Sequence, residues 1–231
     1  MTILNQDHLQ PPFSGSDIDY REHFTPHGHD IYSAQIFTDV FCEHILDRIR
    51  AFNEDAKTDI PDAVNSMHEN AVLSKQLGIT SLVNSFIAFF NDEIAPQILP
   101  ERLKLSIDGV HSYVVRYGQL WDQDLGFHVD ESFLTLNICL NDTFSGSELI
   151  FKGERCPRHI DTSSSPDEQF SIPHKKGRMI IHPGKNRHYV KPISSGERYN
   201  LIIWCHNEAE RQHWFNSIKT RECLDFCGMS I

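Results

Sequence analysis

Apolar residues recur with a helical period in the first part of the chain and with a period of two in the second. After Thr38, which suits the start of a helix, apolar side chains follow at Phe41, Ile45, Ile49 and Phe52. This spacing places them on one face and predicts a helix of about fifteen residues.

A second helical pattern begins at Thr80 and Ser81, which we expect to cap it, and is expected to end at Pro96 and Pro100. Residues 53–78 lie between the two helical patterns and are polar and weakly patterned, so they predict a loop with short structure.

Residues 1–32 are polar and predict irregular structure. Three histidines in this segment could bind a metal or lie near a substrate entrance, but Pro26 and Gly28 favour a surface loop; they are His23, His27 and His29.

From about residue 103 the period changes to two. Tyr113, Val115 and Tyr117 share one face of a predicted strand. In residues 133–140 the even positions are all Leu or Ile, and the odd positions after Phe133 are polar or small. Further strands are predicted at 148–151, 178–184 and 198–204, and a closing helix at 208–220.

Many short strands with helices only at the start and the end predict a mainly β fold with flanking helices, a cupin-like double-sheet jelly roll. We divide the chain into an N-terminal helical support region (1–110), a β core (111–206) and a C-terminal helix and tail (207–231). Residues 153–177 are rich in Ser, Pro and charge, and predict a mobile insertion in the core, with a lid as one interpretation.

The formal net charge of −11 argues against nucleic acid and against an anionic membrane surface as partners. The first residues do not have the pattern of a secretory signal, and no apolar run reaches the roughly 20 residues of a membrane span. We therefore expect a cytoplasmic or nuclear protein with reduced thiols. Cys223 and Cys227 could form a redox or metal pair, although two independent thiols is the interpretation we favour.

His128 and Asp130 are the first candidates for chemistry. They are two residues apart, so on an extended strand both side chains leave the same face. A second histidine from a neighbouring strand, His188, would complete a two-histidine, one-carboxylate triad for divalent iron. Taken alone, the His-x-Asp pattern is a common coincidence in a chain with 14 histidines.

Arg198 follows His188 by ten residues, across a turn-rich segment at 191–197 that can fold the chain back. Its guanidinium could hold one carboxylate of a 2-oxoacid whose other end chelates the metal. The alternative is an arginine in a salt bridge on the surface of a strand.

Several motifs between about Tyr113 and Trp204 resemble those of the iron(II)- and 2-oxoglutarate-dependent oxygenases, in particular the prolyl 4-hydroxylase and lysyl hydroxylase group. They are Val114-Val115-Arg116-Tyr117, His128-Val129-Asp130, Leu134-Thr135-Leu136-Asn137, Gly146 before Leu149-Ile150-Phe151, His182-Pro183-Gly184, His188 and Arg198-Tyr199-Asn200.

The resemblance implies a double-stranded β-helix in which His128, Asp130 and His188 hold the iron and Arg198 binds the distal carboxylate of 2-oxoglutarate. His182 is the competing histidine, but its place before Pro183-Gly184 and the spacing to Arg198 favour His188. The arginine departs from many prolyl hydroxylases of this group, which carry lysine there. The resemblance also implies that Tyr117, Thr135 and Asn137 line the co-substrate site, and we expect Trp204 and Arg116 near the substrate.

The activity that the resemblance implies is hydroxylation of a C–H bond with release of succinate and CO2, using Fe(II), 2-oxoglutarate and, as an optional addition, ascorbate. The substrate would be a lysyl or prolyl side chain of a protein or peptide, or else a small amino-acid-like molecule. Two alternatives from other classes are a non-catalytic metal-binding jelly roll and a zinc hydrolase. The second leaves Arg198 and Tyr117 without a role.

Overall fold

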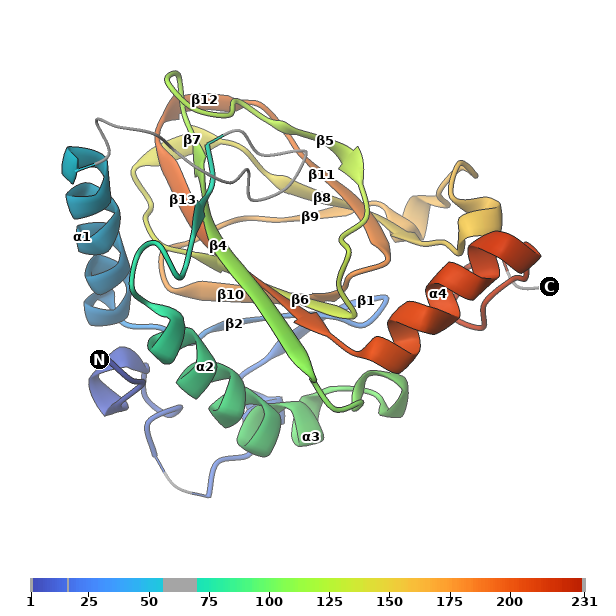
Figure 1. Cartoon of the computed structure of the whole chain (residues 1–231), viewed down its shortest axis with the longest axis horizontal. Helices are drawn as coiled ribbons and strands as arrows, with labels where there is room; N and C mark the ends of the chain where they lie inside the picture. The colour runs from blue at the N-terminus through green and yellow to red at the C-terminus, as the bar shows by residue number, and fades with distance from the viewer. Residues whose placement is uncertain (1, 16, 56–69, 230–231) are drawn as a thin grey trace.

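Two β-sheets of unequal size form the centre of the computed structural model, which describes residues 2–15, 17–55 and 70–229 (Figure 1). All strand pairs are antiparallel. The larger sheet has the order β1 (Thr25–Gly28), β2 (Ile31–Gln35), β10 (Arg178–Pro183), β6 (Leu134–Cys139), β13 (Arg198–His206), β4 (Gly109–Tyr117) and β3 (Val72–Leu73). The smaller has the order β5 (Leu125–His128), β11 (Asn186–Val190), β8 (Leu149–Glu154) and β9 (Phe170–Ile172), and β12 (Ile193–Gly196) pairs with β7 (Phe144–Gly146).

The two faces of the larger sheet have different chemistry, as the alternation in residues 133–140 predicts. The even positions Leu134, Leu136 and Ile138 pack in a core with Phe41 of α1 and Phe86 of α2. The odd positions Thr135 and Asn137 face the opposite side. The arrangement confirms the expected jelly roll flanked by helices.

Helix α1 (Asp39–Asp55) confirms the first predicted helix, and Thr38 accepts a hydrogen bond from the Phe41 amide at 3.4 Å. The predicted cap of α2 (Thr80–Phe89) is wrong, because the N-cap is Ile79, whose side chain makes no capping bond.

The predicted end of the second helix at Pro96 is also wrong. The chain continues through a π-helical turn (Phe90–Ile94) into α3 (Ala95–Ile98). Pro96 lies near the start of α3, directly after the π-helical turn, and it does not end the helix. The helix ends before Pro100, as predicted.

The N-terminal segment is more regular than its composition indicated. Residues within the predicted irregular stretch form the hairpin β1–β2, and β2 pairs with β10 in the larger sheet. His27 bonds to Ser33 at 2.8 Å within this hairpin, and His29 lies in its turn. Of the predicted loop at 53–78, residues 56–69 lie outside the described part of the chain.

Residues 153–177 contain short structure that anchors to the core. Strand β9 pairs with β8, and the 3-10 turns η5 (Pro157–His159) and η6 (Pro166–Glu168) lie between them. Helix α4 (Glu208–Thr220) matches the predicted closing helix. Within the described residues, no helix combines the length and apolarity that a membrane crossing requires.

Candidate metal and co-substrate site

A cavity of about 640 Å³ lies between the two sheets. The alternation of β4 turns Tyr113, Val115 and Tyr117 toward it, as predicted from the sequence. Neighbouring strands are in register, so Tyr117 stands opposite Arg198 on β13. The same register places Trp204 of β13 opposite Thr135 of β6, which in turn stands opposite His182 of β10; all three line the cavity.

His128 and His188 stand opposite each other on paired strands of the smaller sheet. His128 ends β5 and His188 lies in β11, and their ring centroids are 4.2 Å apart. The pairing brings together two side chains that are 60 residues apart in the sequence.

Asp130 lies in the connection between β5 and β6, not on an extended strand with His128 as the spacing suggested. The Asp130 amide donates to the Gly184 carbonyl at 2.9 Å, and the Asp130 carbonyl accepts a hydrogen bond from Lys185 Nζ at 2.9 Å. The Thr135 hydroxyl donates to Asp130 Oδ2 at 2.6 Å. The chain therefore turns between the two sheets after His128, and this turn lets Thr135 face the metal pair.

Three donor atoms converge at this point. Asp130 Oδ1 lies 3.5 Å from His128 Nε2 and 3.6 Å from His188 Nε2. In each ring Nδ1 donates to a backbone carbonyl, at 2.7 Å to Gly126 and 2.8 Å to Asn186. A carbonyl can only accept, so Nδ1 carries a proton in each ring, and in the neutral form of each ring Nε2 has the lone pair that a metal ion needs.

The protonation states also suit a cation. Burial opposes the ionisation of Asp130, but the imidazoles of His188 and His128 lower its pKa below the ordinary range. Burial and the nearby His128 lower the pKa of His188 to about 3. Burial lowers the pKa of His128, but the neighbouring Asp130 carboxylate raises it overall, so a metal ion would displace a proton from this ring at low pH. With both rings neutral, two imidazoles and a carboxylate form the ligand set expected for a non-haem ferrous ion with open positions, so the residues fit that metal.

His182 lies close to this group but differs in its contacts. Its Nε2 is 3.9 Å from Asp130 Oδ2, and its ring packs against those of Phe151 and His188. Burial lowers its pKa. Among the described residues, the set with mutually close ligand atoms contains His128, Asp130 and His188, and not His182.

Arg198 is fully buried at the start of β13 and lines the same cavity. Its guanidinium carbon lies 4.3 Å from the centre of the Tyr117 ring, and Nη1 donates to the Ser147 carbonyl at 2.5 Å. Within the described chain, no carboxylate lies within 4.0 Å of it, and its Nε has no hydrogen-bond partner. A buried cation without an acid is costly, so this group is suited to an anionic ligand.

Tyr117, Thr135 and Asn137, the positions that the resemblance implied for the co-substrate, all line the cavity. Burial raises the pKa of Tyr117 to about 12, so its hydroxyl stays protonated and able to donate. Thr135 is already bonded to Asp130, and Asn137 Oδ1 accepts from Asn200 at 2.5 Å.

Arg116 does not line the cavity, contrary to the expectation from the sequence. It neighbours Tyr117 on β4, and successive residues of a strand point to opposite faces. Its Nε donates to the Asn70 carbonyl and its Nη1 to Asn53 Oδ1, both at 2.7 Å, and it stacks on Trp121.

The sequence interpretation missed an aromatic group beside Trp204. The rings of His111, Tyr113 and Trp204 have centroids 5.3 to 5.7 Å apart, and all three residues line the cavity. His111 extends the alternation of Tyr113 and Val115 by one step, so the period of two could have found it. Its pairing with Trp204 across β4 and β13 could not be read locally.

Comparison with known proteins finds no matching family model. The chain is similar to the 2-oxoglutarate and iron-dependent oxygenase domain-containing protein ICU11 of Arabidopsis thaliana, with 36% identity over 79% of this chain and 46% of that protein. The human 2-oxoglutarate and iron-dependent oxygenase domain-containing protein 2 is 29% identical over 78% of this chain and 50% of its own length. The procollagen-lysine,2-oxoglutarate 5-dioxygenase of Drosophila melanogaster is 25% identical over 75% of this chain and 24% of its own length.

Among solved structures, EvdO2 from Micromonospora carbonacea var. aurantiaca, complexed with 2-oxoglutarate, shares the fold at a TM-score of 0.50. It is 10% identical, and the likeness covers 80% of this chain and 86% of that one. The chain spans about half the length of the first two relatives described above. The family resemblance predicted from the sequence is confirmed by these relatives.

Proposed function

We propose that this chain, a relative of the 2-oxoglutarate- and iron-dependent oxygenases, hydroxylates a C–H bond of a protein side chain of the lysyl or prolyl type, with release of succinate and CO2. The observation that carries the proposal is Arg198, a buried guanidinium without a carboxylate, on the same cavity as the converging Nε2 atoms of His128 and His188.

His128, Asp130 and His188 would hold ferrous iron, which supplies the activation of oxygen when bound. Thr135 fixes one carboxylate oxygen of Asp130, and the two backbone carbonyls fix the imidazole rings. Ligands oriented in this way need no rearrangement when the metal binds.

Arg198 would bind the distal carboxylate of 2-oxoglutarate in the buried part of the cavity. Tyr117 supports the guanidinium from one face, and the Ser147 carbonyl accepts one of its N–H groups. The unpartnered Nε leaves a donor for the incoming anion.

A protein side chain as substrate is supported by the relative named procollagen-lysine,2-oxoglutarate 5-dioxygenase. Glu131 lines the cavity beside the metal ligands and is exposed, so it offers a negative charge to a lysyl ammonium group. The net charge of −11 favours a basic partner in the same way. A small amino-acid-like molecule is the second candidate, since a cavity of about 640 Å³ has the size of a small-molecule site.

The test is succinate formation from 2-oxoglutarate by the purified chain with Fe(II), followed by mass spectrometry of lysyl and prolyl peptides for a gained oxygen. We expect His188→Ala to abolish succinate formation. Oxidation of free amino acids but not of peptides would favour the small-molecule candidate. Iron binding without any succinate would favour a non-catalytic module and overturn the proposal.

A further inference from the structure

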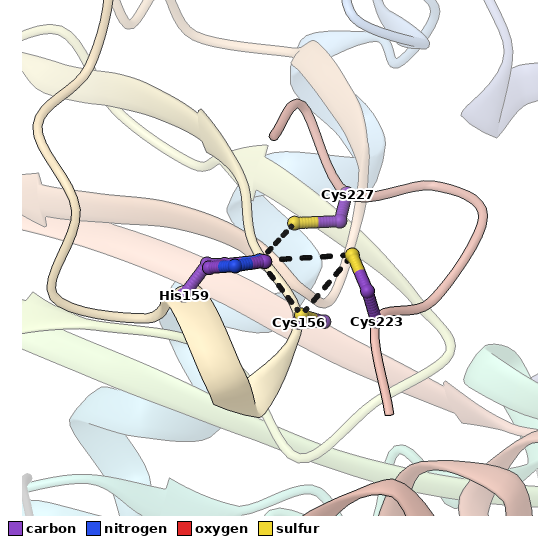
Figure 2. A group of neighbouring side chains, drawn as sticks. All are labelled: Cys156, His159, Cys223 and Cys227. Carbon is purple, nitrogen blue, oxygen red and sulfur yellow. Dashed lines mark hydrogen bonds between the residues drawn. The ribbon is translucent and has the colours of Figure 1, made fainter. Parts of the chain in front are cut away.

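Three cysteines and one histidine from two distant parts of the chain meet outside the cavity (Figure 2). Cys156 immediately precedes the turn η5, and His159 is its last residue. Cys223 and Cys227 lie in the tail that follows α4. We call these four residues the Cys3His cluster. Their ligand atoms all lie within 4.8 Å of one another.

The distances between the ligand atoms of the Cys3His cluster fit a tetrahedrally coordinated metal ion. His159 Nδ1 lies 3.4 Å from the Cys156 and Cys227 sulfurs and 3.6 Å from that of Cys223. The sulfurs of Cys156 and Cys223 are 3.9 Å apart. Zinc bonded tetrahedrally to sulfur and nitrogen requires about 3.6 Å between S and N and about 3.8 Å between two sulfurs.

The spacing in the sequence is also that of a zinc site. Two residues separate Cys156 from His159, and three separate Cys223 from Cys227. Ligand pairs of structural zinc sites are typically separated by a few residues on one short turn. Both pairs meet this condition, since His159 bonds back to the Cys156 carbonyl and Cys227 to the Leu224 carbonyl.

The residues around the Cys3His cluster can balance the net charge of a bound zinc site. A zinc ion with three thiolates and a neutral imidazole has a net charge of about −1. Arg187 is buried nearby, and its hydrogen bonds within the described chain go to uncharged oxygens, including the carbonyls of Ile160 and Thr162 just after His159. An anionic metal centre would place a compensating negative charge close to this guanidinium.

We propose that the Cys3His cluster binds one Zn²⁺ as a structural site. Its four protein ligands leave no open position for a substrate. The ion fastens the C-terminal tail to the 153–177 segment, where the local apolar cluster is small: Leu224 with the partly buried Trp214 and Phe226. The tail thereby gains a fixed attachment next to β11, the strand that carries His188.

The competing use of these thiols is a redox pair. A disulfide between Cys156 and Cys223 would leave Cys227 and His159 without a function, although both point into the same centre (Figure 2). All six cysteines are unbridged, and the other three, Cys42, Cys139 and Cys205, are buried.

The decisive measurement is the Co²⁺ spectrum of the whole chain. Cobalt exchanged into the Cys3His cluster gives a sulfur-to-metal charge-transfer band, which the histidine and carboxylate ligands of the cavity cannot produce. We expect this band in the wild type and in His188→Ala, and its loss in Cys227→Ser. Cys42→Ala, which removes a buried thiol elsewhere, is the matched control and keeps the band.

Zinc content and X-ray absorption spectroscopy provide the second readout. We expect about one zinc per chain with three sulfurs at about 2.3 Å and one nitrogen. Chelation should expose the thiols of the cluster to alkylation, and added zinc should protect them again. Zinc that is lost in His188→Ala but retained in Cys227→Ser, or a Cys156–Cys223 disulfide in freshly purified protein, would overturn the proposal.

Discussion

The substitution Arg198→Met tests the co-substrate site most directly, because it removes a buried charge with little change in volume. A desolvated, hydrogen-bonded charge pair is worth about 2–5 kcal/mol when one partner is removed. For the pair between Arg198 and the distal carboxylate of 2-oxoglutarate, this corresponds to a loss of affinity of about 30-fold to about 4,000-fold.

The stability of the chain without 2-oxoglutarate should respond differently. The guanidinium of Arg198 is buried with no acid within 4.0 Å in the described part of the chain, and desolvating an ion costs several kcal/mol. Its removal leaves the Ser147 carbonyl without this donor, at a cost of about 1–3 kcal/mol. We therefore expect the free energy of unfolding to be equal to or greater than that of the wild type.

Arg116→Met is the matched control. Arg116 is equally buried and stands on the neighbouring strand, but its partners Asn70 and Asn53 belong to the protein and its side chain faces away from the cavity. Its loss should lower the free energy of unfolding by about 1–3 kcal/mol and leave 2-oxoglutarate affinity unchanged.

The assay is calorimetric titration with 2-oxoglutarate, in the absence of oxygen and with a redox-inert divalent metal in the cavity. Denaturant unfolding of the same preparations without 2-oxoglutarate gives the stabilities. Unchanged affinity in Arg198→Met would show that another cation binds the co-substrate. An equal loss of affinity in Arg116→Met would show that the effect is a general distortion of the sheet.

Three further predictions concern a glycine beside the metal site, the metal-binding histidines and a buried ion pair. Gly184→Ala should lower the free energy of unfolding by at least about 2 kcal/mol and weaken metal binding, because a Cβ there would lie 2.0 Å from a backbone oxygen of the turn that carries the carboxylate ligand. Gly126→Ala is the control, since a Cβ there has nothing within 4 Å, and it should change neither stability nor metal binding. Denaturant unfolding and metal titration measure the two effects. His188→Gln should lower iron affinity by more than the roughly 10–100-fold that is typical when a residue that only orients a ligand is lost. His182→Gln should retain iron. Metal analysis after dialysis measures both, and loss of iron from His182→Gln but not from His188→Gln would contradict the ligand assignment. The buried arginine partner of Glu168 lowers the pKa of that carboxyl from 4.5 to about 2, so the stability it provides is present above pH 4.5 and is lost as the pH falls toward 2. Glu168→Gln should be less stable than the wild type at pH 7 by up to about 3 kcal/mol, and its stability should fall less as the pH is lowered. An equal loss of stability with falling pH in both proteins would contradict a contribution from this ion pair.

The parts of the fold that follow from local pattern could be predicted from the sequence. The alternation in residues 133–140 separates the apolar face that packs on the helices from the polar face that lines the cavity. Helix α4 spans the residues predicted for the closing helix. The triad and Arg198 were found because their residue types are rare in combination, although each alone is common.

The parts that depend on tertiary contacts could not be predicted. The hairpin β1–β2 contains Pro26 and Gly28, which are turn formers by propensity, and it forms because β10 offers an edge for pairing. The Cys3His cluster joins residues 67 positions apart, as in Cys156 and Cys223, so no local period reveals it. Asp130 was placed on a strand because spacing cannot show where a chain leaves one sheet for another.

The two faces of strand β13 contribute with opposite sign to the stability of the folded chain. Its outward residues, such as Leu201 and Ile203, pack in the helical core. Its inward residues carry buried polar atoms without a partner in the described chain: Arg198 Nε, Asn200 Oδ1 and Trp204 Nε1. Each such atom costs about 1–3 kcal/mol. A ligand that binds the folded chain at this strand stabilises the folded state by about 2.7 kcal/mol at a hundred times its dissociation constant, so 2-oxoglutarate bound at Arg198 should raise the melting temperature.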